Sequence, residues 1–164
     1  MLVGFGYDIH RLEPGLPLVL GGVPIPGAPA GAVAHSDGDV VLHALCDAML
    51  GAAALNDIGH HFPDTDPQWK GAASLTFVRE VVRLLEGHGL APHNVDCMLI
   101  LERPKIAPYR EEMRAVIADV LGLAVERVSV KATTHEGMGP IGEGRCVVAH
   151  AVATLVPLSP SSAR

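Results

Sequence analysis

The chain has 164 residues, enough for one domain with a sizeable core and too few for two typical domains. Apolar residues make up 49% of the sequence and charged residues 18%, which indicates a globular protein and excludes a disordered one. The formal net charge is -6 and there is no basic run, which argues against nucleic acid as a partner. No apolar stretch approaches the roughly 18 residues of a membrane span, so we expect no membrane association.

The cysteines and the N-terminus indicate the compartment. Cys46, Cys97 and Cys146 are odd in number, lie far apart and never form C-x-x-C, as expected of small buried residues in a reducing compartment. The N-terminus lacks the basic and long apolar segments of a signal peptide. The sequence therefore predicts a cytoplasmic protein, with a single catalytic domain over residues 1–157 and a flexible C-terminal tail over 158–164.

The first elements in chain order are a strand, a hairpin and a helix. Residues 2–13 are rich in β-compatible side chains, and 18–26 form a short hairpin around Gly21-Gly22. After a Pro/Gly/Ala loop, a helix is expected from Ser36, its N-cap, with acidic residues in the first turn. Its apolar stripe consists of Val41, Ala44, Leu45, Ala48 and Ala52.

The second half alternates helices and strands. The elements expected there are a polar loop over 56–71, a helix over 72–87, a strand over 94–102, a helix over 108–121 ended by Gly122, a strand over 127–134, a Gly-rich loop over 134–144 and a last strand over 145–158. This order favours an α/β fold of the α+β-like two-layer sandwich type, in which one mixed sheet carries helices mainly on one face.

Three side chains are candidate metal ligands. Asp8 and His10 are two residues apart in the first strand, so they point to the same face. His43 on the first helix could supply a third donor, and three protein ligands with an open fourth position are typical of catalytic Zn²⁺. The same set also fits non-haem Fe(II), although that site usually occurs in all-β barrels. An ordinary ion pair at a strand end, with a polar helix stripe, is the remaining alternative.

Two carboxylates accompany His43 on the predicted helix. Asp39 and Asp47 lie four residues before and after it, so the three side chains are expected to share a helix face. Asp47 could accept the outer N–H of His43 and fix the tautomer of the ring.

Each of the other polar segments could bind a ligand or could be an ordinary structural or solvent-exposed feature. His35 and Ser36, at the expected start of the helix, could bind phosphate through unpaired backbone N–H groups, or Ser36 could simply cap the helix. The loop 57–66 could bind a polyol or be a solvated turn. Lys105 could meet an anion, and Glu136 could hold an oxygen-seeking ion such as Mg²⁺.

Together these segments resemble the 2-C-methyl-D-erythritol 2,4-cyclodiphosphate synthase family. The resemblance covers about residues 2–156 and is carried by GYDIHR, AHSDGDVVLHALCDAMLGAAALNDIGHHFPDTDP, RPK and KATTHEG, in this order. It implies conversion of 4-diphosphocytidyl-2-C-methyl-D-erythritol 2-phosphate to the cyclic diphosphate with release of CMP, in non-mevalonate isoprenoid biosynthesis. The enzyme class would be a metal-dependent phosphorus-oxygen lyase.

The resemblance also implies the roles of individual residues. Asp8, His10 and His43 would bind one Zn²⁺ per subunit, Glu136 would reach a Mg²⁺ or Mn²⁺ on the substrate diphosphate, and His35 with Thr134 would stabilise the transition state. The implied substrate contacts are Asp8, Ile9, His10, His35, Ser36, Asp57, Ile58, Gly59, Phe62, Pro63, Asp64, Thr65, Asp66, Leu101, Glu102, Arg103, Pro104, Lys105, Ile106, Ala107, Thr133, Thr134, His135 and Glu136.

The family is a homotrimer, so the zinc side and the cytidine side of each site would come from neighbouring chains. A non-enzymatic trimer that binds a nucleotide or an isoprenoid is the alternative to a catalyst. The sequence departs from the family after KATTHEG, where Pro140 replaces an aromatic residue and Glu143 and Arg145 exchange an arginine and a glutamate. His60 and His61 lie where other residues are common in the family, and we assign them no role.

Overall fold

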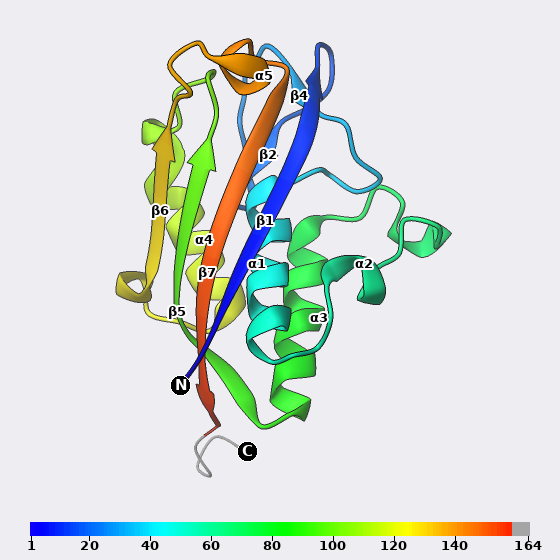
Figure 1. Ribbon diagram of the computed structural model, residues 1–164, viewed down its shortest axis with the longest axis vertical. Coiled ribbons are helices and arrows are strands. Elements are labelled where there is room, and N and C mark those ends of the chain that lie inside the picture. Colours follow the sequence, from blue (N-terminus) through cyan, green and yellow to red (C-terminus); the bar gives the residue numbers. More distant parts are fainter. Residues whose placement is uncertain (159–164) are drawn as a thin grey trace.

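In the computed structural model, which describes residues 1–158, five strands form one sheet and helices pack behind it (Figure 1). The strand order is β4-β1-β7-β5-β6. The sheet strands are β1 (Leu2–Glu13), β4 (Gly31–Ala32), β5 (Leu90–Ile100), β6 (Val128–Thr133) and β7 (Cys146–Pro157). The predicted tail lies outside the described residues, except for Leu158.

The sheet is mixed, as predicted. Strand β7 is central and pairs antiparallel with both β1 and β5, while β4 pairs antiparallel with the end of β1. Strand β6 is parallel to β5, since the helix between them returns the chain to the same end of the sheet.

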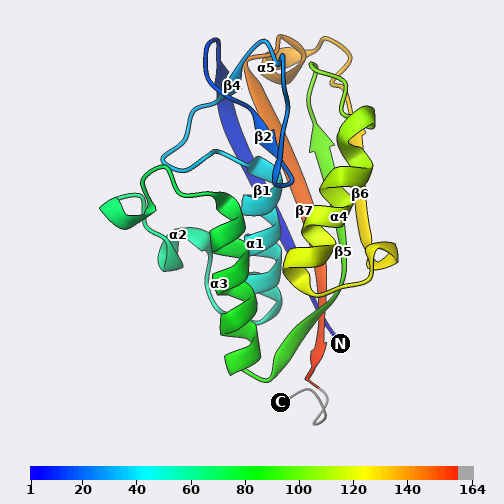
Figure 2. The same ribbon diagram turned by 180° about the vertical axis from the view of Figure 1, so that it is seen from behind.

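Three long helices cover one face of the sheet (Figure 2). They are α1 (Val40–Ala52), α3 (Ser74–Gly87) and α4 (Arg110–Leu121). The short helical segments are α2 (Ile58–His61), η1 (Pro67–Trp69), η2 (Ala107–Tyr109), η3 (Val125–Arg127) and α5 (Gly139–Gly142). None of the helices among residues 1–158 has the length and apolar character needed to cross a membrane.

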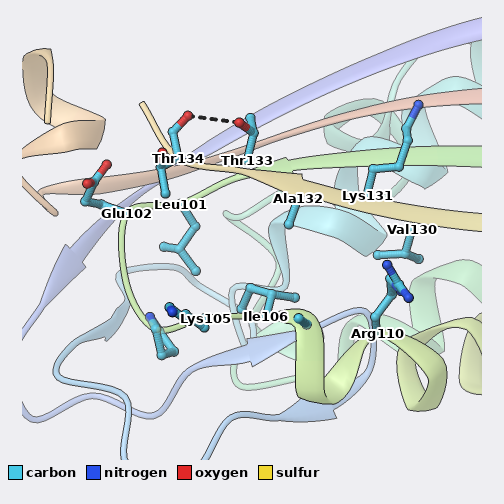
Figure 3. A pocket seen from close by; sticks show the side chains of 12 residues that line it. Leu101, Glu102, Lys105, Ile106, Arg110, Val130, Lys131, Ala132, Thr133 and Thr134 are labelled. Atoms are coloured by element: carbon cyan, nitrogen blue, oxygen red, sulfur yellow. Dashed lines mark hydrogen bonds between the residues drawn. The ribbon is translucent and has the colours of Figure 1, made fainter. Parts of the chain in front are cut away.

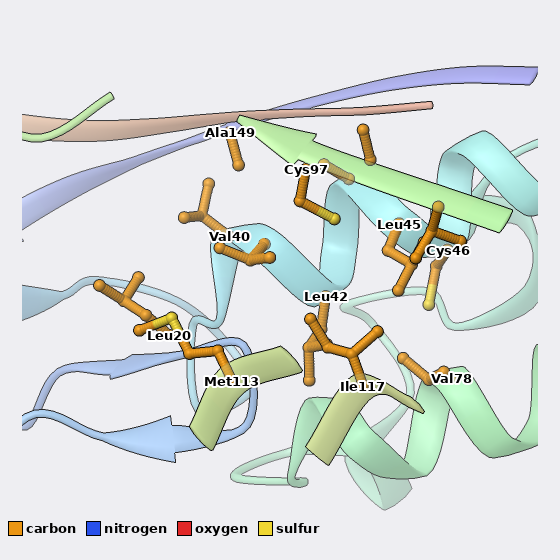
Figure 4. Close-up of a cluster of buried hydrophobic side chains, with 14 of the residues drawn as sticks. Leu20, Val40, Leu42, Leu45, Cys46, Val78, Cys97, Met113, Ile117 and Ala149 are labelled. Carbon is orange, nitrogen blue, oxygen red and sulfur yellow. The ribbon is translucent and has the colours of Figure 1, made fainter. Parts of the chain in front are cut away.

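The core lies between the sheet and the three long helices (Figure 4). Helix α1 occupies its centre: Leu42, Leu45 and Met49 are fully buried, and so are residues on its other faces. The predicted single apolar stripe is therefore too narrow, because α1 has the sheet on one side and α3 on the other. The three cysteines are buried free thiols, as predicted.

Two glycines bring α1 unusually close to β1. In β1, residues alternate between the helix layer and the open face, and Gly4, Gly6, Asp8 and His10 share the inner side. A Cβ on Gly4 would lie 1.9 Å from the carbonyl oxygen of Ala48. Only glycine permits this approach, which places the following α1 side chains directly over Asp8 and His10.

The prediction that Ser36 caps α1 is wrong. The cap is Asp39, whose Oδ1 accepts hydrogen bonds from the backbone N–H groups of Val41 and Leu42. The same carboxylate accepts N–H bonds from Gly21 and Gly22 in the turn between β2 (Val19–Leu20) and β3 (Val23–Pro24). The helix starts at Val40, and its first turn contains no acidic residue.

Other boundaries differ by smaller amounts. Strand β5 begins at Leu90 instead of residue 94, with an irregularity between Pro92 and Asn94 that tolerates the proline. The polar loop 56–71 contains α2 and η1, and the Gly-rich loop contains α5. The hairpin over 18–26 and the end of α4 at Gly122, which has φ 64°, are confirmed.

Candidate functional site

Asp8, His10 and His43 meet at the inner face of β1. The Nε2 atom of His10 lies 3.0 Å from Nδ1 of His43, and Oδ2 of Asp8 lies 3.1 Å from each of these nitrogens. Donors on a tetrahedral ion with bonds of about 2.0–2.1 Å lie about 3.3–3.4 Å apart. The triangle therefore matches one face of such a tetrahedron and leaves the fourth position open.

The chemistry of the three atoms also fits a cation. Two neutral imidazoles offer at most two protons to this triangle, so hydrogen bonds cannot satisfy all three of its edges. One divalent ion can contact all three atoms at once. Within residues 1–158 this is the one group of histidine, cysteine and acidic side chains whose donor atoms converge enough to hold a metal.

Electrostatics keep Asp8 ready as a ligand. Partial burial would raise the pKa of Asp8, but the neighbouring imidazoles, chiefly through the hydrogen bond with His10, outweigh burial and hold the pKa well below its usual range. The carboxylate therefore remains ionised at neutral pH, the form that binds a cation.

The predicted role of Asp47 is wrong. Its Oδ1 accepts the backbone N–H of Ile58 at 2.7 Å, which ties α2 to α1. The outer nitrogen of His43, Nε2, instead lies 2.8 Å from Oγ of Ser74 and 3.2 Å from Oγ of Ser36. Asp39 does not share the face of His43 either, because it precedes the helix and points into the hairpin turn.

A cavity of about 240 Å³ opens next to the triangle. Most of its lining was predicted from the sequence: His10, His35, Ser36, His43, Ile58, Gly59, Phe62 and Asp64. His35 and Ser36 belong to the loop before α1, and the first N–H groups of that helix are already bound by Asp39. The expected phosphate site at a free helix N-terminus is therefore absent at α1.

Sequence reasoning missed two aromatic residues of this cavity, Trp69 and Phe77. Phe77 stacks on Phe62 with ring centroids 4.8 Å apart and lies 5.9 Å from the ring of His43. The chain has only three Phe and one Trp, and three of these four residues fall within residues 62–77. That clustering in the sequence is the signal that could have predicted the aromatic cluster seen here.

Several predicted contacts of the same region do not line the cavity: Asp8, Ile9, Asp57, Pro63, Thr65 and Asp66. Asp57 and Asp66 accept the backbone N–H groups of His60 and Gln68 and so cap α2 and η1. Ile9 points to the open face of the sheet, where its side chain is exposed. Asp8 contributes through the metal triangle instead.

A second pocket, of about 250 Å³, lies between β6 and the segment that precedes α4 (Figure 3). The predicted residues that line it are Leu101, Glu102, Pro104, Lys105, Ile106, Ala107, Thr133 and Thr134. Sequence reasoning missed Val130, Lys131, Ala132 and Arg110. Arg110 and Lys131 lie beside Lys105, but each is paired with a carboxylate, Glu111 at 3.2 Å and Asp96 at 2.6 Å respectively. The three cationic side chains together make the pocket suitable for an anionic ligand.

The loop after β6 is held by Glu102. Its Oε2 accepts the backbone N–H groups of His135, at 3.2 Å, and Gly137, at 3.5 Å. Within this loop, Thr134 Oγ1 donates to Oε1 of Glu136 at 2.8 Å. Glu136, at φ 52°, is exposed and has no second acidic or imidazole donor converging on it among the described residues.

The two pockets lie toward opposite edges of the sheet, near the same end of its strands: His10 pairs with Val147, and the next residue of β7 pairs with Ile100, the partner of Thr133. His35 lines the cavity beside β1, whereas Thr134 follows β6 at the far edge, with β7 and β5 between the two strands. One chain does not bring the two predicted catalytic residues into a common pocket.

The residues that depart from the family pattern line two further cavities. Glu143, Arg145 and Arg103 line one of about 430 Å³, and Pro140 and Arg145 line another of about 410 Å³. Arg145 Nε lies 2.6 Å from Oε2 of Glu143. The exchanged arginine and glutamate thus reach the same cavity as an ion pair.

This fold and site define a class: a two-layer α/β protein with three convergent side chains that could hold a metal ion beside one cavity, and a second pocket, lined by lysine and arginine, toward the opposite edge of the sheet. Within that class the chain belongs to the YgbB family, whose sequence profile matches residues 1–156.

Relatives with known names support this membership. The 2-C-methyl-D-erythritol 2,4-cyclodiphosphate synthase of Symbiobacterium thermophilum is 57% identical over 155 residues, which cover 94% of this chain and 98% of the relative. A solved structure of another 2C-methyl-D-erythritol-2,4-cyclodiphosphate synthase, in a form with CDP bound, has a TM-score of 0.87 and 44% identity, covering 94% of this chain and 99% of that one. The IspF–CDP complex of Plasmodium falciparum has a TM-score of 0.84 and 34% identity, covering 96% and 97%.

Proposed function

We propose that this protein is a cyclodiphosphate synthase, which converts 4-diphosphocytidyl-2-C-methyl-D-erythritol 2-phosphate to 2-C-methyl-D-erythritol 2,4-cyclodiphosphate and releases CMP. The observation that carries the proposal is the convergence of Asp8, His10 and His43 on one point beside a cavity. Family membership supports the same reaction.

The reaction is an intramolecular phosphoryl transfer, in which the 2-phosphate attacks the β-phosphorus and CMP leaves. A phosphate nucleophile is already ionised near neutral pH, so the chain needs no general base. Catalysis therefore depends on holding the two phosphates in line and on balancing the charge that develops on phosphoryl oxygens.

Asp8, His10 and His43 would hold Zn²⁺, which supplies Lewis-acid stabilisation of a phosphate oxygen when bound. His35 and Ser36 would hold the phosphate side of the substrate. The part of the cavity wall that would enclose the methylerythritol consists of Ile58, Gly59, Phe62 and Asp64. The stacked rings of Phe62 and Phe77 restrict solvent on that side, which strengthens the charge interactions within.

The pocket between β6 and α4 would bind the cytidine diphosphate end. Lys105 would contact the nucleotide phosphates, and Thr134 would stabilise the transition state together with His35. Because Glu136 stands alone as an oxygen donor, the phosphate oxygens would supply the other ligands of a Mg²⁺ or Mn²⁺ held there.

We propose that the two halves of the site are completed by association into a homotrimer. The open face of the sheet exposes a group of large apolar side chains: Val3, Phe5, Tyr7, Ile9 and Val152. Such a surface favours contact with another protein. A neighbouring copy would then bring its Thr134 pocket to this chain's metal cavity, and the separation of the two pockets within one chain supports this proposal.

The test uses purified protein with the cytidylyl substrate in oxygen-isotope-labelled water. The proposal expects CMP and the cyclic diphosphate in equal amounts, no label at phosphorus and one zinc per chain. Release of CDP, label in the product, or iron with a dependence on O₂ would refute it. Binding of CMP by metal-free protein without turnover would favour the non-enzymatic alternative. The mass in solution tests the trimer.

A further inference from the structure

Ser74, which has no role in the proposed reaction, contacts His43 on the side away from the metal triangle, and Asp37 contacts Ser74 in turn. Ser74, the fully buried first residue of α3, places its Oγ 2.8 Å from Nε2 of His43. The same hydroxyl donates a hydrogen bond to Oδ1 of Asp37. The contacts form a chain from Asp37 through Ser74 to the imidazole.

The direction of each hydrogen bond follows from the number of protons. Asp37 accepts from Ser74 Oγ, from the Ser74 backbone N–H at 3.0 Å and from the Asp39 backbone N–H at 3.2 Å. A carboxylate that only accepts has no proton to return. The single hydroxyl proton of Ser74 therefore points to Asp37, and its oxygen presents a lone pair to His43.

This arrangement requires a proton on Nε2 of His43. In a neutral imidazole the other nitrogen, Nδ1, then carries a lone pair. Nδ1 is the atom that lies 3.1 Å from Oδ2 of Asp8 and 3.0 Å from Nε2 of His10. We propose that Ser74 and Asp37 are positioning residues that lock His43 in the Nε2–H tautomer and present Nδ1 as a donor to the cation.

Backbone contacts keep the chain of bonds in place. The loop before α1 runs beside the start of α3, where the Asp37 N–H donates to the carbonyl of Ala72 at 3.0 Å and the Gly71 N–H donates to that of His35 at 2.8 Å. The hydrogen-bonded chain from Asp37 through Ser74 to His43 therefore joins two segments that are distant in sequence, and backbone hydrogen bonds hold these segments together.

Ser36 is the weaker candidate for this role. Its Oγ is 3.2 Å from Nε2 of His43 and also accepts the Gly38 N–H at 3.2 Å. Ser36 lines the cavity, while Ser74 is buried away from it. The Ser36 hydroxyl is thus free to contact a ligand in the cavity, while Ser74 keeps its hydrogen bond to the His43 imidazole.

The inference rests on the proposed metal-binding role of His43, and its test has a readout independent of turnover. Ser74→Ala removes the hydroxyl, and Thr76→Ala is the matched control, because it removes a hydroxyl two residues further along α3. Nitrogen NMR of histidine-labelled, zinc-free protein reports which nitrogen of His43 carries the proton. Chelator competition gives the zinc affinity, and thermal melting confirms that each variant is folded.

We expect the Nε2–H tautomer in the wild type and in Thr76→Ala, and a mixture that includes Nδ1–H in Ser74→Ala. Zinc affinity should fall about 10- to 100-fold in Ser74→Ala, the usual effect of losing a group that orients a metal ligand. A folded Ser74→Ala protein with the wild-type tautomer and zinc affinity would overturn the inference, as would Nδ1–H in the wild type. If the wild type binds no zinc, the metal centre of the proposed function is refuted. The tautomer of His43 in the metal-free protein still tests whether Ser74 and Asp37 orient the imidazole.

Discussion

Gly6 of β1 lies against Ala44 of α1 so closely that a Cβ on Gly6 would be 1.9 Å from the carbonyl oxygen of Ala44. The next inner-facing residues of the strand are Asp8 and His10, and the residue before Ala44 is His43. The close backbone contact therefore sets the distance at which the three candidate ligands meet.

Gly6→Ala should force α1 away from β1. Overpacking of this kind costs about 3 kcal/mol of stability, and the displaced His43 should bind zinc more weakly. Chemical denaturation and chelator competition measure the two effects. Gly87→Ala is the control, since a Cβ there meets nothing within 4 Å and its stability should stay within about 1 kcal/mol of the wild type. Equal stability and equal zinc affinity of the two variants would show that the close contact between β1 and α1 does not set the geometry of the site.

His43→Ala should remove zinc from the folded protein. Only Asp8 and His10 remain as ligands, and two protein ligands are too few to bind zinc stably. Bound zinc should therefore fall from one per chain to near zero. CMP release should fall by at least about a hundredfold, comparable with the loss of one major electrostatic group. Elemental analysis and a turnover assay measure these effects. His88→Ala provides the control, because His88 is an exposed residue at the end of α3 that bonds to the Leu84 carbonyl. Retention of zinc by His43→Ala would remove it from the ligand set.

Much of this site follows from local patterns in the sequence. Alternation along β1 put Asp8 and His10 on one face, and the helical segment that follows HSDGD delivers His43 to them. Both inferences need only the period of a strand and the existence of one helix, which local residues determine.

Contacts between distant segments were not predictable in the same way. Asp39 caps α1 and also binds the turn at Gly21-Gly22, and Ser74 replaces Asp47 as the partner of His43. In both cases several carboxylates or hydroxyls within the sequence could have formed the bond. The choice among them depends on how the loop 35–39 packs against the hairpin and α3, which is a property of the tertiary fold.

Lys105→Met should weaken the binding of CDP about tenfold or more, because a hydrogen bond to a charged group is worth about 1.5–3 kcal/mol. Lys105 lines the pocket between β6 and α4, where Arg110 and Lys131 also contribute charge. Calorimetry at low and high salt should show that the CDP affinity of the variant depends less on salt than that of the wild type. Lys70→Met, which removes an exposed lysine outside that pocket, should leave CDP affinity unchanged. Equal affinities of the Lys105 variant and the wild type would place the nucleotide elsewhere.

Asp39→Asn should change the pH dependence of stability. Burial raises the pKa of Asp39 to about 6, although the N–H groups of Gly22, Gly21 and Leu42 lower it in part. A carboxyl whose pKa is higher folded than unfolded favours folding below the unfolded value near 4, and this contribution is lost as pH rises through about 6. Stability of the wild type relative to Asp39→Asn should therefore fall by about 3 kcal/mol between pH 4 and pH 7, following about 1.4 kcal/mol per pKa unit.

Urea denaturation of both proteins across this range measures the difference, and taking that difference cancels the titration of Asp8 and the other shared groups. A difference that stays constant, or that moves in favour of the wild type as pH rises, would mean that the four backbone N–H groups hold Asp39 ionised throughout.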